Sequence, residues 1–197
     1  MLALLRRKGG FRGEMVGVDY SGRSVELARE LQRVRGHSVY GDSESEGEDQ
    51  GEDDGEDEGT QIRFEEYDIL NPHSTPSNLD WFPTNQFGFD IVLDKGTFDA
   101  VSLSDEIDPF AQRRVCERYP VAARGLVRRG GFLVVTSCNW TEEELMRWFT
   151  GTGTGTGDRV EGGEEDRLEV WGRVEYPRFR FGGKEGQGVC TVCFQRV

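Results

Sequence analysis

Three aspartates each follow a short, largely apolar segment, and carboxylates in that position can bind a ligand. They are Asp19 after MVGV, Asp68 after IRFEEY and Asp94 after FDIVL. Ligands of open α/β sheets bind beyond the carboxyl ends of the strands. One carboxylate there can accept from two ribose hydroxyls, and its neighbour from an exocyclic adenine amine. A single aspartate after a strand is more often a turn former or helix cap, but three in register favour a nucleoside site.

The elements that must position these aspartates alternate between strands and helices. Ser21 is a good helix N-cap, and Leu27, Ala28, Leu31 and Val34 follow at helical spacing. Further strands are predicted at 15–18, 62–64, 89–93 and 132–136, further helices at 113–128 and 141–149, and a closing strand pair at 168–176 and 189–197. Pro120 must either kink the helix at 113–128 or restart it in a first turn, Gly130–Gly131 ends it, and residues 141–144 form a capping box that opens the next helix. This order predicts an α/β fold: a Rossmann-like, mainly parallel sheet with an antiparallel C-terminal edge.

Two segments interrupt this alternation. Residues 41–60 are predicted to be a disordered acidic insertion, and residues 150–166 a flexible glycine-rich linker. The stretch from Asp42 to Glu58 holds 11 of the 37 acidic residues, so the remaining 26 nearly balance 24 basic ones. The length of 197 residues favours a single domain, 1–197.

The composition also bears on partners and compartment. No sequence-wide basic footprint suggests nucleic acid or an anionic membrane surface, and no apolar run approaches a membrane span. We therefore expect a soluble, cytoplasmic protein whose four cysteines are free thiols. Cys190 and Cys193 have the spacing of half a zinc site, but no second pair matches them, which favours two thiols on an apolar strand.

Five short strings together resemble one enzyme family. They are GVDYS (17–21), EEYDIL (65–70), LDKGTFDAVSL (93–103), TSCNWTEEEL (136–145) and FRFGGKEGQGV (179–189). They resemble the S-adenosylmethionine-dependent seven-β-strand methyltransferases, in the branch that methylates a lysine of translation elongation factor 1-alpha. The resemblance covers nearly the whole chain outside the acidic insertion and the linker. DKGTFDA and SCNWT are the strings specific to this branch.

The resemblance implies a role for each matching residue. The cofactor S-adenosylmethionine would be held by Asp19 at the ribose and bordered by Tyr20, with Asp68 and Ile69 flanking the adenine. The reaction would take place beside Asp94 and Lys95, with Asn139 and Trp140 shaping the substrate entrance. Asp94 would lie next to the sulfonium of the cofactor as well as the incoming amine.

Lysine chemistry is compatible with these roles. A lysine amine is nucleophilic only when neutral, and its unperturbed pKa is about 10.4, so the site must help its proton leave. A carboxylate such as Asp94 can orient the attacking nitrogen and offset the charge of the departing proton. For Lys95 a solvent-facing or structural ion-pair role is equally consistent with the sequence.

The family pattern also begins with a strand and a D/E-x-G-x-G-x-G loop, and residues 1–16 do not contain them. We therefore expect the first strand of the sheet to be missing, and the cofactor to bind weakly or not at all. An inactive methyltransferase-like fragment, a binding protein that uses its acidic loop, and a small-molecule methyltransferase remain alternative interpretations.

Overall fold

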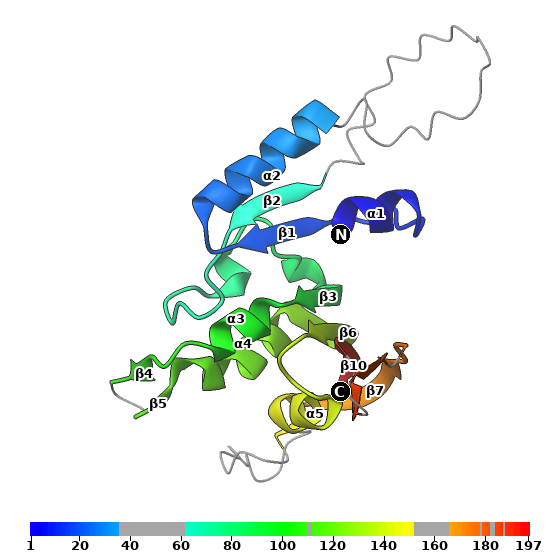
Figure 1. Cartoon of the computed structure of the whole chain (residues 1–197). Coiled ribbons are helices and arrows are strands. Elements are labelled where there is room, and N and C mark those ends of the chain that lie inside the picture. The colour runs from blue at the N-terminus through cyan, green and yellow to red at the C-terminus, as the bar shows by residue number, and fades with distance from the viewer. Residues whose placement is uncertain (36–61, 110–111, 152–165, 178, 182–183, 187) are drawn as a thin grey trace, which may run out of the picture. The chain divides into compact units, whose positions relative to one another are not determined.

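A computed structural model describes residues 1–35, 62–109, 112–151, 166–177, 179–181, 184–186 and 188–197 (Figure 1). The predicted insertion at 41–60, nearly all of the linker at 150–166 and the turn at 182–183 lie outside these residues. The chain forms two compact units, Met1–Asp68 and Ile69–Val197. They are called the N-terminal unit and the C-terminal unit below, and that the whole chain is one domain stays a prediction.

The N-terminal unit is built on two parallel strands. Its elements are α1 (Leu2–Arg7), β1 (Val16–Asp19), α2 (Gly22–Arg35) and β2 (Arg63–Glu66). Val16 pairs with Arg63 and Asp19 with Glu66, so both strands end at the same edge. The predicted helix is confirmed as α2, yet Leu27, Leu31 and Val34 are exposed.

The hydrogen bonds from α2 to the neighbouring strand segment come from polar side chains, on a different part of the helix from Leu27, Leu31 and Val34. The Arg29 Nε donates to the Phe64 carbonyl at 3.0 Å, and the Gln32 amide donates to the Ile62 carbonyl at 2.9 Å. Val25 is the buried apolar residue of this helix. An apolar face inferred from spacing was therefore not the face that the helix buries.

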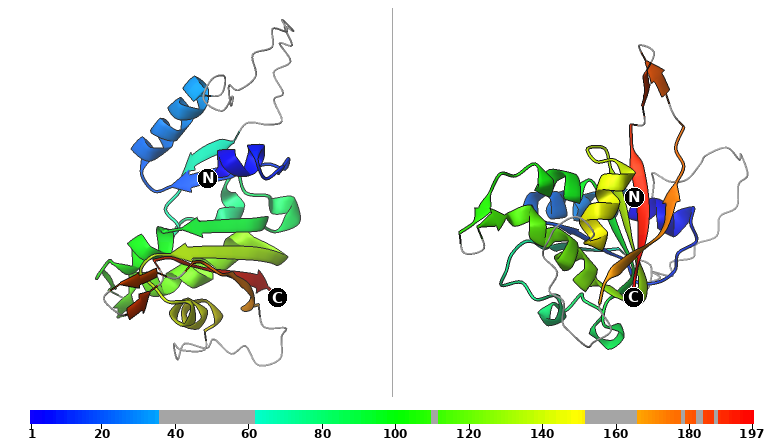
Figure 2. Two further views of the ribbon diagram at one scale, coloured as in Figure 1. Left: turned by 45° about the vertical axis from the view of Figure 1, so that its right-hand side comes forward. Right: turned by 90° about the horizontal axis from the view of Figure 1, so that it is seen from below.

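The C-terminal unit contains a four-stranded sheet in the order β3-β6-β10-β7. β3 and β6 are parallel, whereas β10 is antiparallel to both β6 and β7, which lie on either side of it (Figure 2). The sheet strands are β3 (Phe89–Lys95), β6 (Val127–Ser137), β7 (Leu168–Val174) and β10 (Cys190–Arg196), and the longer helices are α3 (Thr97–Ser102), α4 (Tyr119–Leu126) and α5 (Glu142–Thr150). The smaller elements are η1 (Pro76–Asn78), η2 (Thr84–Gln86), η3 (Val115–Arg118), β4 (Ile107–Asp108), β5 (Arg113–Arg114), β8 (Phe179–Phe181) and β9 (Lys184–Gly186).

The α/β class and the antiparallel C-terminal edge are confirmed. The parallel pairs are β1 with β2 in the N-terminal unit and β3 with β6 in the C-terminal unit. Both pairs come earlier in the chain than β10, which pairs antiparallel with its neighbours. Thr141 and Glu144 form the predicted capping box at the start of α5. None of the helices in the described segments is long and apolar enough to cross a lipid bilayer.

The region around α4 was predicted only in part. Pro120 lies in the first turn of α4, which is the restart that the sequence allowed, but residues 113–118 form β5 and η3 and are not α-helical. The Gly130–Gly131 pair lies inside β6 and does not end a helix. Gly130 has φ +75°, and a Cβ on Gly131 would come within 2.9 Å of the Asp90 carbonyl, so the strand irregularity here requires glycine.

The core of the C-terminal unit lies between one face of this sheet and helices α3, α4 and α5. Alternate residues of the strands enter it, including Leu133 and Val135 of β6 and Val192 and Phe194 of β10. Phe98 of α3 is 1% exposed. Its ring centroid lies between 5.1 and 5.8 Å from those of Tyr119, Trp140, Trp148 and Phe149.

We expect Phe98→Ala to destabilise the protein by about 3–5 kcal/mol, because it leaves a cavity where four rings converge. Urea unfolding followed by near-UV circular dichroism measures this. Phe87, 82% exposed, offers the matched control, and Phe87→Ala should change the free energy of unfolding by less than about 0.5 kcal/mol. Equal losses in the two variants would contradict this description of the core.

Candidate active site

The N-terminal unit places two of the predicted cofactor residues at the carboxyl edge of its sheet. Asp19 ends β1, and Asp68 follows β2 by two residues. The Tyr67 N–H donates to the Asp19 carbonyl at 2.9 Å, which continues the pairing beyond the end of β2. Tyr20, between β1 and α2, is 77% exposed. Asp19, Tyr20 and Asp68 therefore belong to one sheet edge, whereas Asp94, predicted in register with the two aspartates, lies in a strand of the other sheet.

The Asp19 carboxylate has capacity for a ligand. Its Oδ1 accepts from the Ser21 N–H at 2.8 Å, a contact that fixes the turn into α2. A carboxylate offers about four acceptor positions, and Asp19 is exposed. Asp68 is also exposed. These groups fit the hydroxyls and amine of an adenosine.

In the C-terminal unit, Asp94 occupies a very different environment. It is 4% exposed, and its oxygens accept from the Thr97 N–H at 2.9 Å, the Phe98 N–H at 3.2 Å and the Tyr119 hydroxyl at 2.9 Å. Gly96, at φ +81°, makes the tight turn that brings the start of α3 onto this carboxylate. Asp94 therefore caps α3 and joins it to α4.

Burial also shifts the pKa values of Asp94 and its partner Tyr119. Desolvation raises the pKa of Asp94 above its ordinary value, although the hydrogen bonds from Tyr119, Phe98 and Thr97 oppose that rise. Desolvation and the neighbouring Asp94 charge raise the pKa of Tyr119 well above its ordinary value. Tyr119 therefore remains a hydroxyl donor to Asp94 over the physiological pH range.

Lys95 is exposed and occupies the last position of β3, paired with Thr136 of β6. Successive side chains of a strand point to opposite faces, so the Lys95 side chain leaves the sheet on the face opposite Asp94. The structure thus places both residues at the strand end, but it does not bring their charged groups together on one face.

The segment after β6 carries the two predicted entrance residues. Asn139 is exposed, and Trp140 is half-buried. The Trp140 ring stacks on Phe98 at a centroid distance of 5.8 Å and meets Trp148 at 5.7 Å. Its indole N–H donates to the Ser102 hydroxyl at 3.0 Å. Ile69, predicted beside the adenine, is half-buried and packs against the core of the C-terminal unit.

The sequence did not identify Asp99, Ser137 or Tyr119 as part of this region. Asp99 is 9% exposed and accepts from the Ser137 hydroxyl at 2.5 Å. An acid inside the apolar string TFDAV was the available signal for Asp99. Tyr119 gave none, because a tyrosine in a helix is ordinary.

Cys190 and Cys193 lie on opposite faces of β10, so their sulfur atoms do not converge on one point. Cys190 is buried in the core, and desolvation raises its pKa to about 11, whereas Cys193 lies on the other face of β10. Within the ranges that the structure describes, no three His, Cys, Asp or Glu side chains gather closely enough to hold a metal ion.

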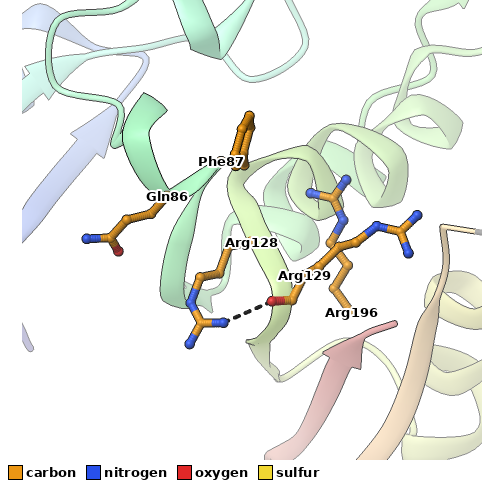
Figure 3. A pocket seen from close by; sticks show the side chains of 5 residues that line it. All are labelled: Gln86, Phe87, Arg128, Arg129 and Arg196. Atoms are coloured by element: carbon orange, nitrogen blue, oxygen red, sulfur yellow. Dashed lines mark hydrogen bonds between the residues drawn. The ribbon is translucent and has the colours of Figure 1, made fainter.

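A pocket of about 470 Å³ lies near the opposite end of the β3–β6 pair, away from these residues (Figure 3). Its lining residues are Gln86, Phe87, Arg128, Arg129 and Arg196. Arg128 donates to Asp90 at 2.6 Å, and Arg196 forms an ion pair with Asp166 at 2.6 Å. None of the predicted site residues lines this pocket.

Comparison with known proteins gives relatives of one kind, although no family model matches the chain. Protein-lysine N-methyltransferase EFM4 of Saccharomyces cerevisiae is 32% identical over 184 residues, which are 93% of this chain and 60% of that protein. EEF1A lysine methyltransferase 2 of Homo sapiens is 28% identical over 190 residues, 96% of this chain and 58% of that protein.

The chain therefore spans about 60% of the length of these relatives. Among solved structures, N-methyltransferase NodS from Bradyrhizobium japonicum in complex with S-adenosyl-L-homocysteine is 14% identical, with a TM-score of 0.45 and coverage of 93% of this chain and 66% of that one. On its sequence, this chain is a homologue of the protein-lysine methyltransferases named EFM4 and EEF1A lysine methyltransferase 2.

Proposed function

We propose that this chain serves S-adenosylmethionine-dependent methylation of a lysine in translation elongation factor 1-alpha. The observation that carries the proposal is the identity of 32% with EFM4 along 93% of the chain. The arrangement of carboxylates at the strand ends supports it, because that edge of an α/β sheet is where ligands bind.

In this proposal the N-terminal unit binds the adenosine part of the cofactor. Asp19 accepts from the ribose hydroxyls, Asp68 accepts from the adenine amine, and Tyr20 borders the ring system. Ile69 follows Asp68 directly in the chain and is proposed to contribute apolar contact beside the adenine. Bound S-adenosylmethionine supplies a methyl group on a sulfonium.

The C-terminal unit orients the lysine amine. The Asp94 carboxylate has about four acceptor positions, and three of them accept hydrogen bonds from the protein itself. About one position is therefore left for the N–H of an incoming amine. Its hydrogen bonds also fix the turn at Lys95–Thr97, and they therefore hold the exposed Lys95 at the strand end. Asn139 and Trp140 contact the protein substrate. Positioning of this kind supplies much of the rate gain in a direct displacement.

Purified elongation factor 1-alpha, incubated with this chain and cofactor labelled in its methyl group, tests the proposal. With the cofactor at a high concentration, as the weak binding expected from the sequence requires, we expect label in the elongation factor, and no label after its lysines have been blocked. Label found only in small molecules would instead favour a small-molecule methyltransferase. A wild-type chain that labels neither would refute the proposed activity.

Removing the Asp19 charge should weaken cofactor binding. Hydrogen bonds to a charged acceptor contribute about 1.5–3 kcal/mol, so Asp19→Asn should raise the Kd for S-adenosylmethionine by about 10- to 150-fold. The asparagine oxygen can still accept from Ser21, which preserves the turn. Isothermal titration makes the measurement, with the exposed Asp105→Asn as the control that should bind like wild type. Similar affinities in all three proteins would remove Asp19 from the cofactor site.

Asp94→Asn should lower turnover about 10-fold or more while it leaves cofactor affinity within about threefold, the pattern expected of an interaction made mainly in the transition state. Steady-state methylation of elongation factor 1-alpha and titration of the cofactor give the two numbers. Turnover equal to wild type would show that Asp94 acts only as the cap of α3.

Tyr119→Phe tests the buried pair through its pH dependence. It removes a hydrogen bond that lowers the pKa of Asp94, so the raised pKa rises further. An acid whose folded pKa is raised stabilises the fold below its unfolded pKa, near 3.8, and loses that contribution as the pH rises through the folded value.

We therefore expect Tyr119→Phe to cost about 1–3 kcal/mol of unfolding free energy at pH 7.5, since Asp94 loses one of its three donors, and clearly less at pH 4, because the lost hydrogen bond favours the ionised form of Asp94. Urea unfolding at the two pH values provides the comparison. A cost that does not change with pH would show that the hydroxyl does not interact with a titrating Asp94.

A further inference from the structure

The backbone N–H groups of residues 138–140, the segment after β6, donate to side-chain oxygens. The ladder with β10 ends at Ser137, which pairs with Cys190. Beyond it, the Cys138 N–H donates to Asp99 Oδ2 at 2.8 Å. The next two N–H groups, of Asn139 and Trp140, donate to the Ser137 hydroxyl oxygen at 3.1 and 2.9 Å. Three successive backbone donors therefore end on Asp99 or on Ser137.

Asp99 determines how Ser137 accepts these bonds. A serine hydroxyl has one donor and two acceptor positions. The donor of Ser137 is given to Asp99 Oδ1 at 2.5 Å, so both acceptor positions are turned to the two N–H groups. Ser137 is 1% exposed and Asp99 is 9% exposed, which leaves little water to replace either contact.

The same turn of α3 also holds the indole of Trp140. The Ser102 hydroxyl donates to the Asp99 carbonyl at 2.9 Å and accepts from the Trp140 indole N–H at 3.0 Å. Asp99 thus holds the backbone of this segment through its carboxylate, and the indole through its carbonyl and Ser102. The ring is further fixed by Phe98 and Trp148.

We propose that Asp99 is a positioning residue for the protein substrate, acting through Ser137 and Ser102 on Asn139 and Trp140. This inference rests on the proposed function. The exposed Asn139 and the half-buried Trp140 lie beside the end of β3, where Asp94 and Lys95 are placed. A binding segment that is already ordered loses less entropy on association, so the contribution of Asp99 is to affinity for the protein substrate.

Asp99→Asn is the informative change, because asparagine has the same size but only one acceptor oxygen. It can serve either Ser137 or Cys138, and its amide N–H groups then face the other donor. We expect the KM for elongation factor 1-alpha to rise about tenfold, with kcat and the KM for the cofactor each within about twofold of wild type. Asp105→Asn, nearby and exposed, should leave all three values unchanged.

A second variant and a second measurement separate positioning from general loss of structure. Ser102→Ala removes the acceptor of the indole together with the donor to the Asp99 carbonyl, but it leaves the Asp99 carboxylate and Ser137 unchanged, and we expect it to raise the same KM by a smaller factor. In protein labelled with ¹⁵N-tryptophan, the indole N–H of Trp140, assigned with Trp140→Phe, should shift and exchange faster with solvent in Asp99→Asn and Ser102→Ala.

The outcomes distinguish the two proposals. A normal KM for the elongation factor in a folded Asp99→Asn, or a fall in kcat with KM unchanged, would overturn the role of Asp99. If the wild-type chain transfers no methyl group, the proposed activity fails, and affinity for elongation factor 1-alpha without cofactor decides the role of Asp99. A Kd about tenfold weaker in Asp99→Asn supports that role, whereas an equal Kd, or no binding by wild type, refutes it.

Discussion

A backbone N–H that leaves the end of a β-strand must find a new acceptor, and in this protein a carboxylate repeatedly provides it. Asp19 accepts from Ser21 after β1, Asp94 accepts from Thr97 and Phe98 after β3, and Asp99 accepts from Cys138 after β6. Buried backbone donors without a partner are costly, so each carboxylate stabilises the path that the chain takes out of the sheet. Much of the arrangement at these strand ends depends on this requirement.

The same requirement divides the carboxylates into two kinds. Asp19 gives one oxygen to the backbone and remains exposed, so it retains acceptors for a ligand. Asp94 and Asp99 are buried, and both oxygens of each accept from protein groups. Their contribution to chemistry must therefore include what they hold in place, since a preorganised site loses little free energy in reordering when substrate binds.

The sequence identified the strand ends correctly because apolar runs followed by an acid and a turn are local signals. It did not reveal that Asp94 faces the core. The run FDIVLD is nearly continuous in apolar residues, so period-2 alternation could not say whether Val92 and Asp94, or Ile91 and Leu93, point inward. That choice is made by Tyr119, 25 positions away in sequence, whose hydroxyl reaches the carboxylate. Asp99 was missed for a related reason, since its partner Ser137 lies 38 positions further along the chain.

The incorrect predictions for the buried face of α2 and for the glycine pair in β6 have a similar cause. Leu27, Leu31 and Val34 form a face at helical spacing, yet the contacts of α2 with its strand come from Arg29, Gln32 and Val25. Gly130 and Gly131 resemble a helix stop, but they occur where β6 passes so close to the Asp90 carbonyl that a Cβ would not fit. In both places a local pattern had two structural solutions. The long-range contact selected between them, and the same holds for the buried carboxylates, whose burial depends on partners supplied by distant elements.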